Sequence, residues 1–232
     1  MADFATLQQA LGVTFNDLSL LKQALVHRSY LNENPDFSLP SNERLEFLGD
    51  AFLGFVIAQK LYREFPDLSE GEMTKLRAAL VRQRTLARLA SSLGLGDYLY
   101  MGLGEEATGG RAKQSTLARA LEAVVGAVVI DQGFAGAEDF VFRLFQGEID
   151  RAMEEMATGD YKSRLQELVQ ARYRVPPLYR TIKEEGPDHD KEFTVEVIVN
   201  GSVIGTGRGK SKRMAEMDAA RVALESFSRD SQ

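Results

Sequence analysis

The chain has 232 residues and 44% of them are hydrophobic, which is ordinary for one or two globular domains. It contains no cysteine, which excludes disulfides, thiolate zinc sites and cysteine nucleophiles. The net charge is −6, but residues 161–232 hold 13 basic and 11 acidic side chains, whereas residues 1–160 hold 15 and 23. Any affinity of the C-terminal part for nucleic acid must therefore depend on where its charges lie.

No run of 18 consecutive apolar residues is present, and the first residues lack the basic and apolar regions of a signal peptide. We therefore expect no membrane helix and a cytoplasmic location.

Residues 1–156 show the apolar spacing of helices and no convincing strand, and we expect them to form one all-helical domain. Helices are predicted over residues 4–11, 18–26, 43–65, 70 to about 93, 115–130 and 135–156, with a glycine-rich loop over 102–110. Ser41 or Asn42 is the expected cap of the third helix, and Ser115 of the fifth. Ser69 and Glu72 have the spacing of a capping box at the start of the fourth.

Residues 157–160 are the predicted linker, and the pattern changes after it. Residues 161–229 are predicted to form a small second domain in the order α-β-β-β-α. Its helices are expected at 161–172 and 212–227, and its strands at 178–184, 192–199 and 203–208. Asn200-Gly201 is a strong hairpin-turn sequence between the last two strands. The fold class is therefore mainly α, with one small sheet.

The helix predicted at residues 43–65 begins with an unusual set of carboxylates. Glu43, Glu46 and Asp50 fall within roughly 60° of one another around a helix, beside apolar residues. Like charges on one stripe repel, so this arrangement is compatible with a site for a hard cation. It is equally compatible with an acidic surface helix, and spacing alone does not separate the two interpretations.

Residues 42–50, Asn-Glu-Arg-Leu-Glu-Phe-Leu-Gly-Asp, resemble the signature of bacterial ribonuclease III. The resemblance continues in residues 27–30, His-Arg-Ser-Tyr, in residues 70–77, and in residues 121–127, Leu-Glu-Ala-Val-Val-Gly-Ala. Residues 161–229 resemble a double-stranded-RNA-binding domain. The resemblance covers nearly the whole chain and implies a helical endonuclease domain followed by an RNA-binding domain.

The resemblance implies a magnesium site, with manganese as a possible substitute. Glu46 and Glu122 would be ligands, and Asp50 would be a further ligand or would orient one. Asp50 and Glu122 would be the catalytic carboxylates. Glu43 and Glu70 would be accessory, at a subunit contact or at the edge of the RNA.

One position departs from the family pattern. Where the family has Ala-Asp-x-x-Glu-Ala, residues 118–123 read Ala-Arg-Ala-Leu-Glu-Ala. Arg119 thus stands where a metal-binding aspartate is expected, and no carboxylate lies between Lys113 and Leu121 to replace it. The change puts a cation beside a proposed cation site and bears on catalytic competence rather than on family membership.

In the second domain, the resemblance implies RNA contacts from the first helix, from one loop and from the start of the last helix. These contacts would come from Gln166, Glu167, His189, Lys210, Lys212 and Arg213. The segment Gly205–Ser211 lacks the first glycine of a Walker A loop, which excludes a nucleotide site there. His27 is expected to make a structural hydrogen bond rather than to act as a general base.

The resemblance implies a homodimeric, magnesium-dependent endoribonuclease in which each subunit cuts one strand of a double-stranded RNA. The products would carry 5′-phosphate and 3′-hydroxyl ends with short 3′ overhangs. Ribosomal RNA precursors would be the usual substrates, with some transfer and messenger RNAs. The alternative is a double-stranded-RNA-binding protein that keeps the nuclease fold but cleaves little or nothing because of Arg119. A helical metal carrier is disfavoured because no Glu-x-x-His pair is present.

Overall fold

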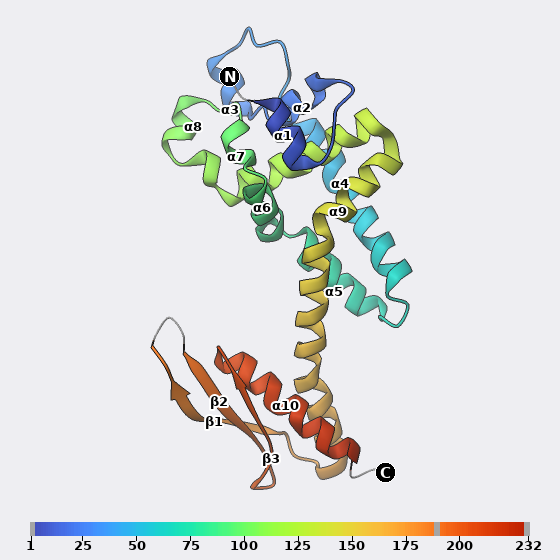
Figure 1. Ribbon diagram of the computed structural model, residues 1–232, viewed down its shortest axis with the longest axis vertical. Helices are drawn as coiled ribbons and strands as arrows, with labels where there is room; N and C mark the ends of the chain where they lie inside the picture. The colour runs from blue at the N-terminus through green and yellow to red at the C-terminus, as the bar shows by residue number, and fades with distance from the viewer. Residues whose placement is uncertain (1–2, 188–190, 230–232) are drawn as a thin grey trace. The chain divides into compact units, whose positions relative to one another are not determined.

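The computed structural model describes residues 3–187 and 191–229 and contains two compact units, Met1–Ala152 and Met153–Gln232. The first unit is helical, as predicted, and its described residues add only an isolated bridge between Val26 and Tyr100. Its elements are α1 (Phe4–Leu11), α2 (Leu18–Ala24), α3 (Arg28–Glu33), α4 (Glu43–Glu64), α5 (Glu70–Val81), α6 (Gln83–Ser92), α7 (Leu95–Tyr98), α8 (Leu103–Ala107) and the 3-10 turn η1 (Gly110–Ala112) (Figure 1).

Helix α9 (Gln114–Tyr173) contributes to both units. It is interrupted at Gly133, where φ is 72° and ψ is −173°, a combination essentially restricted to glycine. This break lies between the helices predicted at 115–130 and 135–156. The residues predicted as a linker, 157–160, have helical backbone within α9.

The core of the first unit is built around α4 and the beginning of α9. The fully buried side chains of α4 include Val56, Ile57 and Leu61, and those of α9 include Leu121, Val124, Val125 and Val128. By length and composition alone, the segment Gln114–Met153 could cross a membrane, although no run of 18 consecutive apolar residues occurs. Half of that stretch is buried inside the fold, so packing accounts for its hydrophobicity.

Several expected boundaries in the first unit were wrong. The helix expected from residue 70 to about 93 is divided at Arg82, which has extended backbone (φ −66°, ψ 149°). The loop expected over 102–110 contains α8 and the start of η1. Helix α9 begins at Gln114, so Ser115 lies inside it and does not cap it.

The start of α4 shows a related difference. Asn42 precedes the helix, but its side chain makes no capping bond and instead donates to the carbonyl of Ala24 at 3.2 Å. Its backbone N–H donates to the carbonyl of Val26 at 2.9 Å. Asn42 therefore fastens the acidic end of α4 to the segment after α2. The capping box of Ser69 and Glu72 is confirmed.

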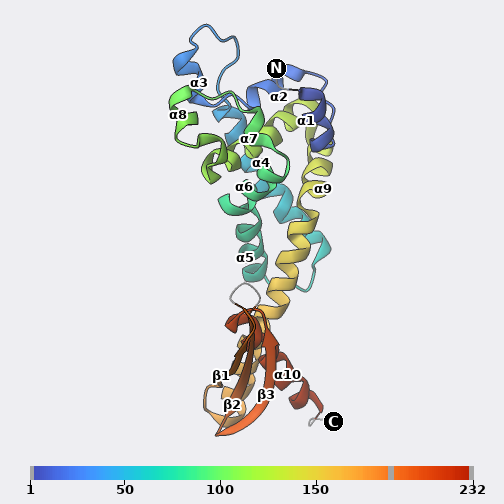
Figure 2. The same ribbon diagram turned by 60° about the vertical axis from the view of Figure 1, so that its left-hand side comes forward.

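The second unit confirms the predicted α-β-β-β-α order. Strands β1 (Leu178–Glu185), β2 (Glu192–Val199) and β3 (Ser202–Gly209) form an antiparallel sheet in sequence order, and α10 (Lys212–Arg229) covers one face (Figures 1 and 2). Both Asn200 and Gly201 have positive φ, as a tight hairpin turn requires. A Cβ atom on Gly207 would lie 2.0 Å from the backbone nitrogen of Ala219, so β3 and α10 touch through their backbones.

Candidate active site and RNA-binding surface

Helices α4 and α9 cross in direct backbone contact, and this crossing positions the acidic residues. A Cβ atom on Gly49 would lie 1.8 Å from the carbonyl oxygen of Glu122, and one on Gly126 would lie 2.2 Å from that of Leu45. Distances this short leave no room for any side chain at either glycine. The crossing therefore sets Glu46 and Asp50 of α4 beside Glu122 of α9.

Glu122 is the most perturbed carboxyl group of this set. Burial, together with the negative charges of Asp50 and Glu46, raises its pKa to about 7, whereas the positive charge of Arg119 opposes the rise. Burial also raises the pKa of Glu46, and the positive charge of Arg119 again opposes the rise. The three carboxylates thus share one electrostatic environment that is short of positive charge.

Arg119 lies at the edge of this acidic group. Its Nε is 3.4 Å from Oε1 of Glu46, so a side chain of α9 makes an ion pair with one of α4. Within residues 3–187 and 191–229, no three acidic or histidine side chains are arranged as a ready metal-binding group. The donor set is nevertheless made of carboxylate oxygens, which are the ligands that hard divalent cations prefer.

The two accessory carboxylates face other partners. Glu43 accepts a hydrogen bond from the Ser41 hydroxyl at 2.9 Å and lies 3.9 Å from the Arg28 guanidinium. Glu70, at the start of α5, accepts from the Thr74 hydroxyl at 3.1 Å and lines a shallow hollow between α4 and α5. The negative charge of Glu43 also helps to raise the pKa of the Glu46 carboxyl group.

His27 has the predicted structural role. Its Nδ1 lies 2.7 Å from the Ser29 hydroxyl and accepts from the Ser29 N–H, so the ring caps helix α3. The Ser29 hydroxyl in turn accepts from the N–H of Gly102 at 3.0 Å. Burial lowers the pKa of His27, which keeps the ring neutral for this cap.

The predicted RNA-binding residues lie on the surface of the second unit. Gln166 and Glu167 are exposed on α9, and Lys210, Lys212 and Arg213 are exposed around the start of α10. His189 falls outside the described residues. Ser211 accepts from the N–H of Met214 at the start of α10.

The Lys212 side chain already has partners within the second unit. Its Nζ forms a 2.7 Å ion pair with Glu184 and also lies over the ring of Phe193. A phosphate that bound Lys212 would have to compete with this carboxylate. The cost is small because both side chains are open to solvent, which screens the ion pair.

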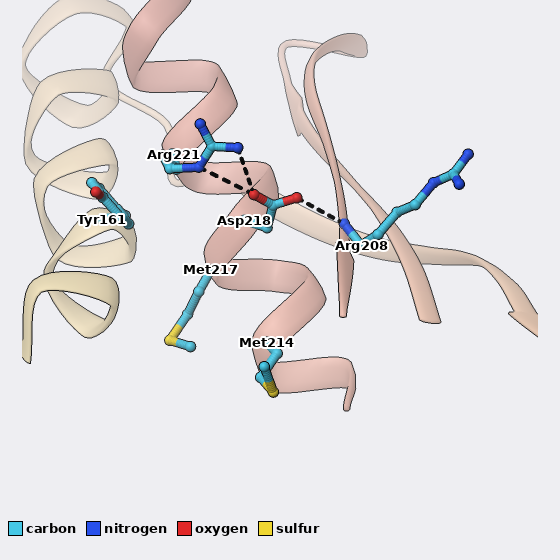
Figure 3. A pocket seen from close by; sticks show the side chains of 6 residues that line it. All are labelled: Tyr161, Arg208, Met214, Met217, Asp218 and Arg221. Atoms are coloured by element: carbon cyan, nitrogen blue, oxygen red, sulfur yellow. Dashed lines mark hydrogen bonds and ion pairs between the residues drawn. The ribbon is translucent and has the colours of Figure 1, made fainter. Parts of the chain in front are cut away.

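The second unit contains a hollow of about 270 Å³ (Figure 3). Asp218 at its edge accepts from the Arg208 backbone N–H and from the Arg221 guanidinium, so its charge is satisfied internally. The methionines Met214 and Met217 and the aromatic ring of Tyr161 complete the lining. These contacts join α10 to β3 and stabilise the second unit.

The sequence resembles characterised families in both units. Residues 17–148 match the family described as Ribonuclease-III-like, and residues 161–226 match the double-stranded RNA binding motif. A protein named Ribonuclease 3 from Dehalococcoides mccartyi is 48% identical over 227 residues, covering 98% of this chain and 96% of that protein. The chain belongs to the ribonuclease III family.

Two further comparisons agree. Ribonuclease 3 of Enterococcus faecalis is 46% identical over 223 residues, covering 95% of this chain and 96% of that protein. The crystallised nuclease domain of ribonuclease III from Campylobacter jejuni is 41% identical with a TM-score of 0.58, over 62% of this chain and 97% of that domain. Similarity over nearly the full length favours a ribonuclease III enzyme over an RNA-binding protein without cleavage.

The sequence pattern did not indicate the roles of Gly49 and Gly126. Both occur in the motifs of the ribonuclease III family, but their function is to let two helix backbones touch. The sequence offered one signal, which was an isolated glycine within each of two strongly apolar helices. Such a glycine lowers helix stability, so its presence indicates a position where close packing requires it.

The raised pKa of Glu122 predicts how the stability of the metal-free protein depends on pH. The folded protein retains this proton up to about pH 7, whereas an unfolded chain loses it near 4.5, so the free energy of unfolding falls as pH rises between these values. The Glu122→Gln variant has no carboxyl group to titrate at this position, so this decrease in the free energy of unfolding should be absent. From pH 5 to pH 8 in EDTA, the parent should lose about 1–2 kcal/mol more stability than the variant, after discounting for solvent screening. Parallel losses, measured by calorimetry at both pH values, would contradict the assignment.

Proposed function

We propose that this chain is an endoribonuclease that hydrolyses phosphodiester bonds in double-stranded RNA. The observation that carries the proposal is the group of carboxylates at the crossing of α4 and α9, in a chain that also contains a double-stranded RNA binding motif. The first unit would carry the catalytic residues, and the second unit would bind the RNA. The products would be 5′-phosphate and 3′-hydroxyl ends with short 3′ overhangs.

Magnesium is the cation that this donor set would take, with manganese as a substitute. Glu46 and Glu122 would bind it, and Asp50 would bind or orient a ligand. The chemistry supplied by the bound cation is activation of water and stabilisation of charge on the leaving 3′-oxygen. Burial of Glu122 among like charges supports this proposal, because carboxylates held together without a cation repel one another.

A cleavage assay on a long perfect duplex RNA tests the proposal. The full chain should convert end-labelled duplex to short fragments when magnesium is raised from micromolar to tens of millimolar. Single-stranded RNA of the same sequence should remain intact. A chain that binds the duplex without cutting it at any magnesium or manganese concentration would refute the proposal.

We also propose that the chain acts as a homodimer through an apolar patch on α4 and α9. The patch consists of Phe47 (80% exposed), Phe55, Ile130 and Phe134, and the rings of Phe55 and Phe134 contact each other. A hollow of about 530 Å³ lies beside Phe47 and could receive an aromatic side chain of a second copy. The Campylobacter jejuni structure was described with reference to a region involved in dimer formation. Exposed apolar surface of this kind is typical of an interface.

Phe47→Asp should dissociate the dimer, because it places a charge on the most exposed residue of the patch. We expect the dissociation constant to rise at least about 100-fold in sedimentation equilibrium, as for an aromatic residue that carries much of the binding energy of an interface. Leu103→Asp on α8 is the matched control, since Leu103 is 76% exposed but lies outside the patch. Equal dissociation in both variants, or in neither, would place the interface elsewhere.

The RNA contacts of the second unit predict a sequence-independent effect. Lys212→Ala combined with Arg213→Ala should weaken binding to all duplexes alike and should reduce the slope of log affinity against log salt by about 1–2, because phosphate contacts carry the interaction. Filter binding at several salt concentrations would measure both quantities.

A matched control removes two positive charges from the sheet, on the face that is turned away from the buried core of the second unit. Arg180 and Lys183 pair across strands with Glu196 and Thr194, on the face away from the buried Val195 and Val197. The double alanine variant at 180 and 183 should retain the parental slope. A loss confined to one RNA sequence in the test variant would contradict a phosphate role.

We further propose cytoplasmic ribosomal RNA precursors as the main substrates, with some transfer and messenger RNAs. The proposal rests on family membership. No nucleotide cofactor is required. Mapping the ends of precursor RNA after digestion by the purified chain would test it.

A further inference from the structure

Arg119 places a positive charge against one of the proposed cation ligands. Its Nε is 3.4 Å from Oε1 of Glu46, and the two side chains come from different helices. The Arg119 side chain is 62% exposed, whereas that of Glu46 is 24% exposed. The guanidinium therefore reaches in from solvent towards a carboxylate that is largely covered.

The pairing is of a kind that can be broken. The ion pair is made through Nε at 3.4 Å, which is longer than a typical N–H···O hydrogen bond, and solvent screens it on the exposed arginine side, so it contributes little. Arginine is long enough to move its charge several ångströms without any backbone change. The backbones of α4 and α9 are packed against each other at Gly49 and Gly126, so a movement of the Arg119 side chain is the simplest way to make room for a cation.

We propose that Arg119 is a built-in competitor of the divalent cation, which neutralises Glu46 in the metal-free protein and swings into solvent when the cation binds. The inference rests on the proposed function, since it takes Glu46 as a ligand. It makes Arg119 a residue that sets how much divalent cation the enzyme requires. The residue acts through Glu46 and needs no contact with the reacting phosphate.

Binding of manganese to the metal-stripped full chain, without RNA, tests this competition. Free Mn²⁺ is measured by electron paramagnetic resonance. Arg119→Gln keeps a polar side chain and removes the charge, and it should bind Mn²⁺ about tenfold more tightly. Arg119→Asp adds a carboxylate and should bind on the order of 100-fold more tightly, because charges beside a divalent ion act at short range.

Arg63→Gln is the matched control. It removes the same charge from α4 at a position about 25 Å along the helix from Glu46, beyond the range of screened electrostatics at physiological salt. Its Mn²⁺ affinity should equal that of the parent. Circular dichroism of each variant verifies that the fold is retained, which is expected because Arg119 is exposed.

A double-mutant cycle with Glu46→Gln separates competition from a general charge effect. In the Glu46→Gln background, Arg119→Gln should improve Mn²⁺ binding less than about threefold, because the competed ligand is gone. Equal Mn²⁺ affinity of the parent and Arg119→Gln, or an equal gain in both backgrounds, would overturn the inference.

These results are distinct from a failure of the proposed function. A chain that gains Mn²⁺ affinity on losing Arg119 but never cuts duplex RNA supports the competition and refutes the nuclease. A chain that cuts duplex RNA but whose Mn²⁺ affinity is unchanged by the Arg119 substitutions supports the proposed nuclease and refutes the competition.

Discussion

Glu122→Gln should abolish cleavage of duplex RNA and leave RNA binding nearly unchanged. The substitution preserves the shape of the side chain but removes the charge of a proposed ligand at the most buried position of the acidic group. A bound cation stabilises the transition state by several kcal/mol, and each 1.36 kcal/mol is a factor of ten in rate. We therefore expect a loss on the order of a thousandfold or more in single-turnover assays.

The control for this loss is Asp139→Asn, which removes one negative charge from an exposed position of the same helix. It should cleave like the parent. Duplex affinity, measured in calcium to prevent turnover, should be equal for the parent and both variants. Cleavage by Glu122→Gln at the parental rate would mean that Glu122 is not a ligand.

Gly49→Ala should destabilise the first unit and also eliminate cleavage. The added Cβ would lie 1.8 Å from the carbonyl oxygen of Glu122, a backbone atom that no side-chain rotation can move aside. Helices α4 and α9 would have to separate, with a cost of about 3 kcal/mol or more. Calorimetric unfolding of the metal-free protein would measure the loss, and a duplex cleavage assay would report the disrupted site.

Gly54→Ala on the same helix is the matched control, because nothing lies within 4 Å of the Cβ it would add. Alanine is a better helix former than glycine by about 0.8–1 kcal/mol, so this variant should be slightly more stable than the parent and fully active. If both variants behaved alike, helix propensity rather than the crossing would be responsible. Gly126→Ala should behave as Gly49→Ala does.

Local sequence patterns were enough to predict most helices, the second unit and the residues of the acidic group. Periodicity identified α4 with an error of one residue at its end, and the alternation in residues 192–199 matched β2 at both ends. These signals are local, because an amphipathic face and a turn sequence each depend on neighbouring residues. The motif of the ribonuclease III family supplied the link between Glu46 and Glu122, which local patterns could not.

The errors arose where individual side-chain hydrogen bonds, rather than hydrophobic periodicity, decide the conformation. Helix α8 was predicted as loop because of its glycines, but Glu33 accepts hydrogen bonds from the N–H groups of Leu103 and Gly104 and so caps it from about 70 residues away. The break at Arg82 carries neither glycine nor proline. It is held by Thr85, whose buried hydroxyl donates to the carbonyl of Ala79.

The anchoring of the N-terminal segment on α9 has a consequence for synthesis on the ribosome. The backbone N–H groups of Asn16 and Asp17 donate to the carboxylate of Asp131, more than a hundred residues later. Because contacts between such distant residues form only after both have emerged, the first unit cannot complete its fold while α9 is still being made. A nascent chain in which residue 122 has not yet emerged displays Glu46 and Asp50 but lacks both Glu122 and the helix crossing. The acidic group therefore assembles only late in synthesis.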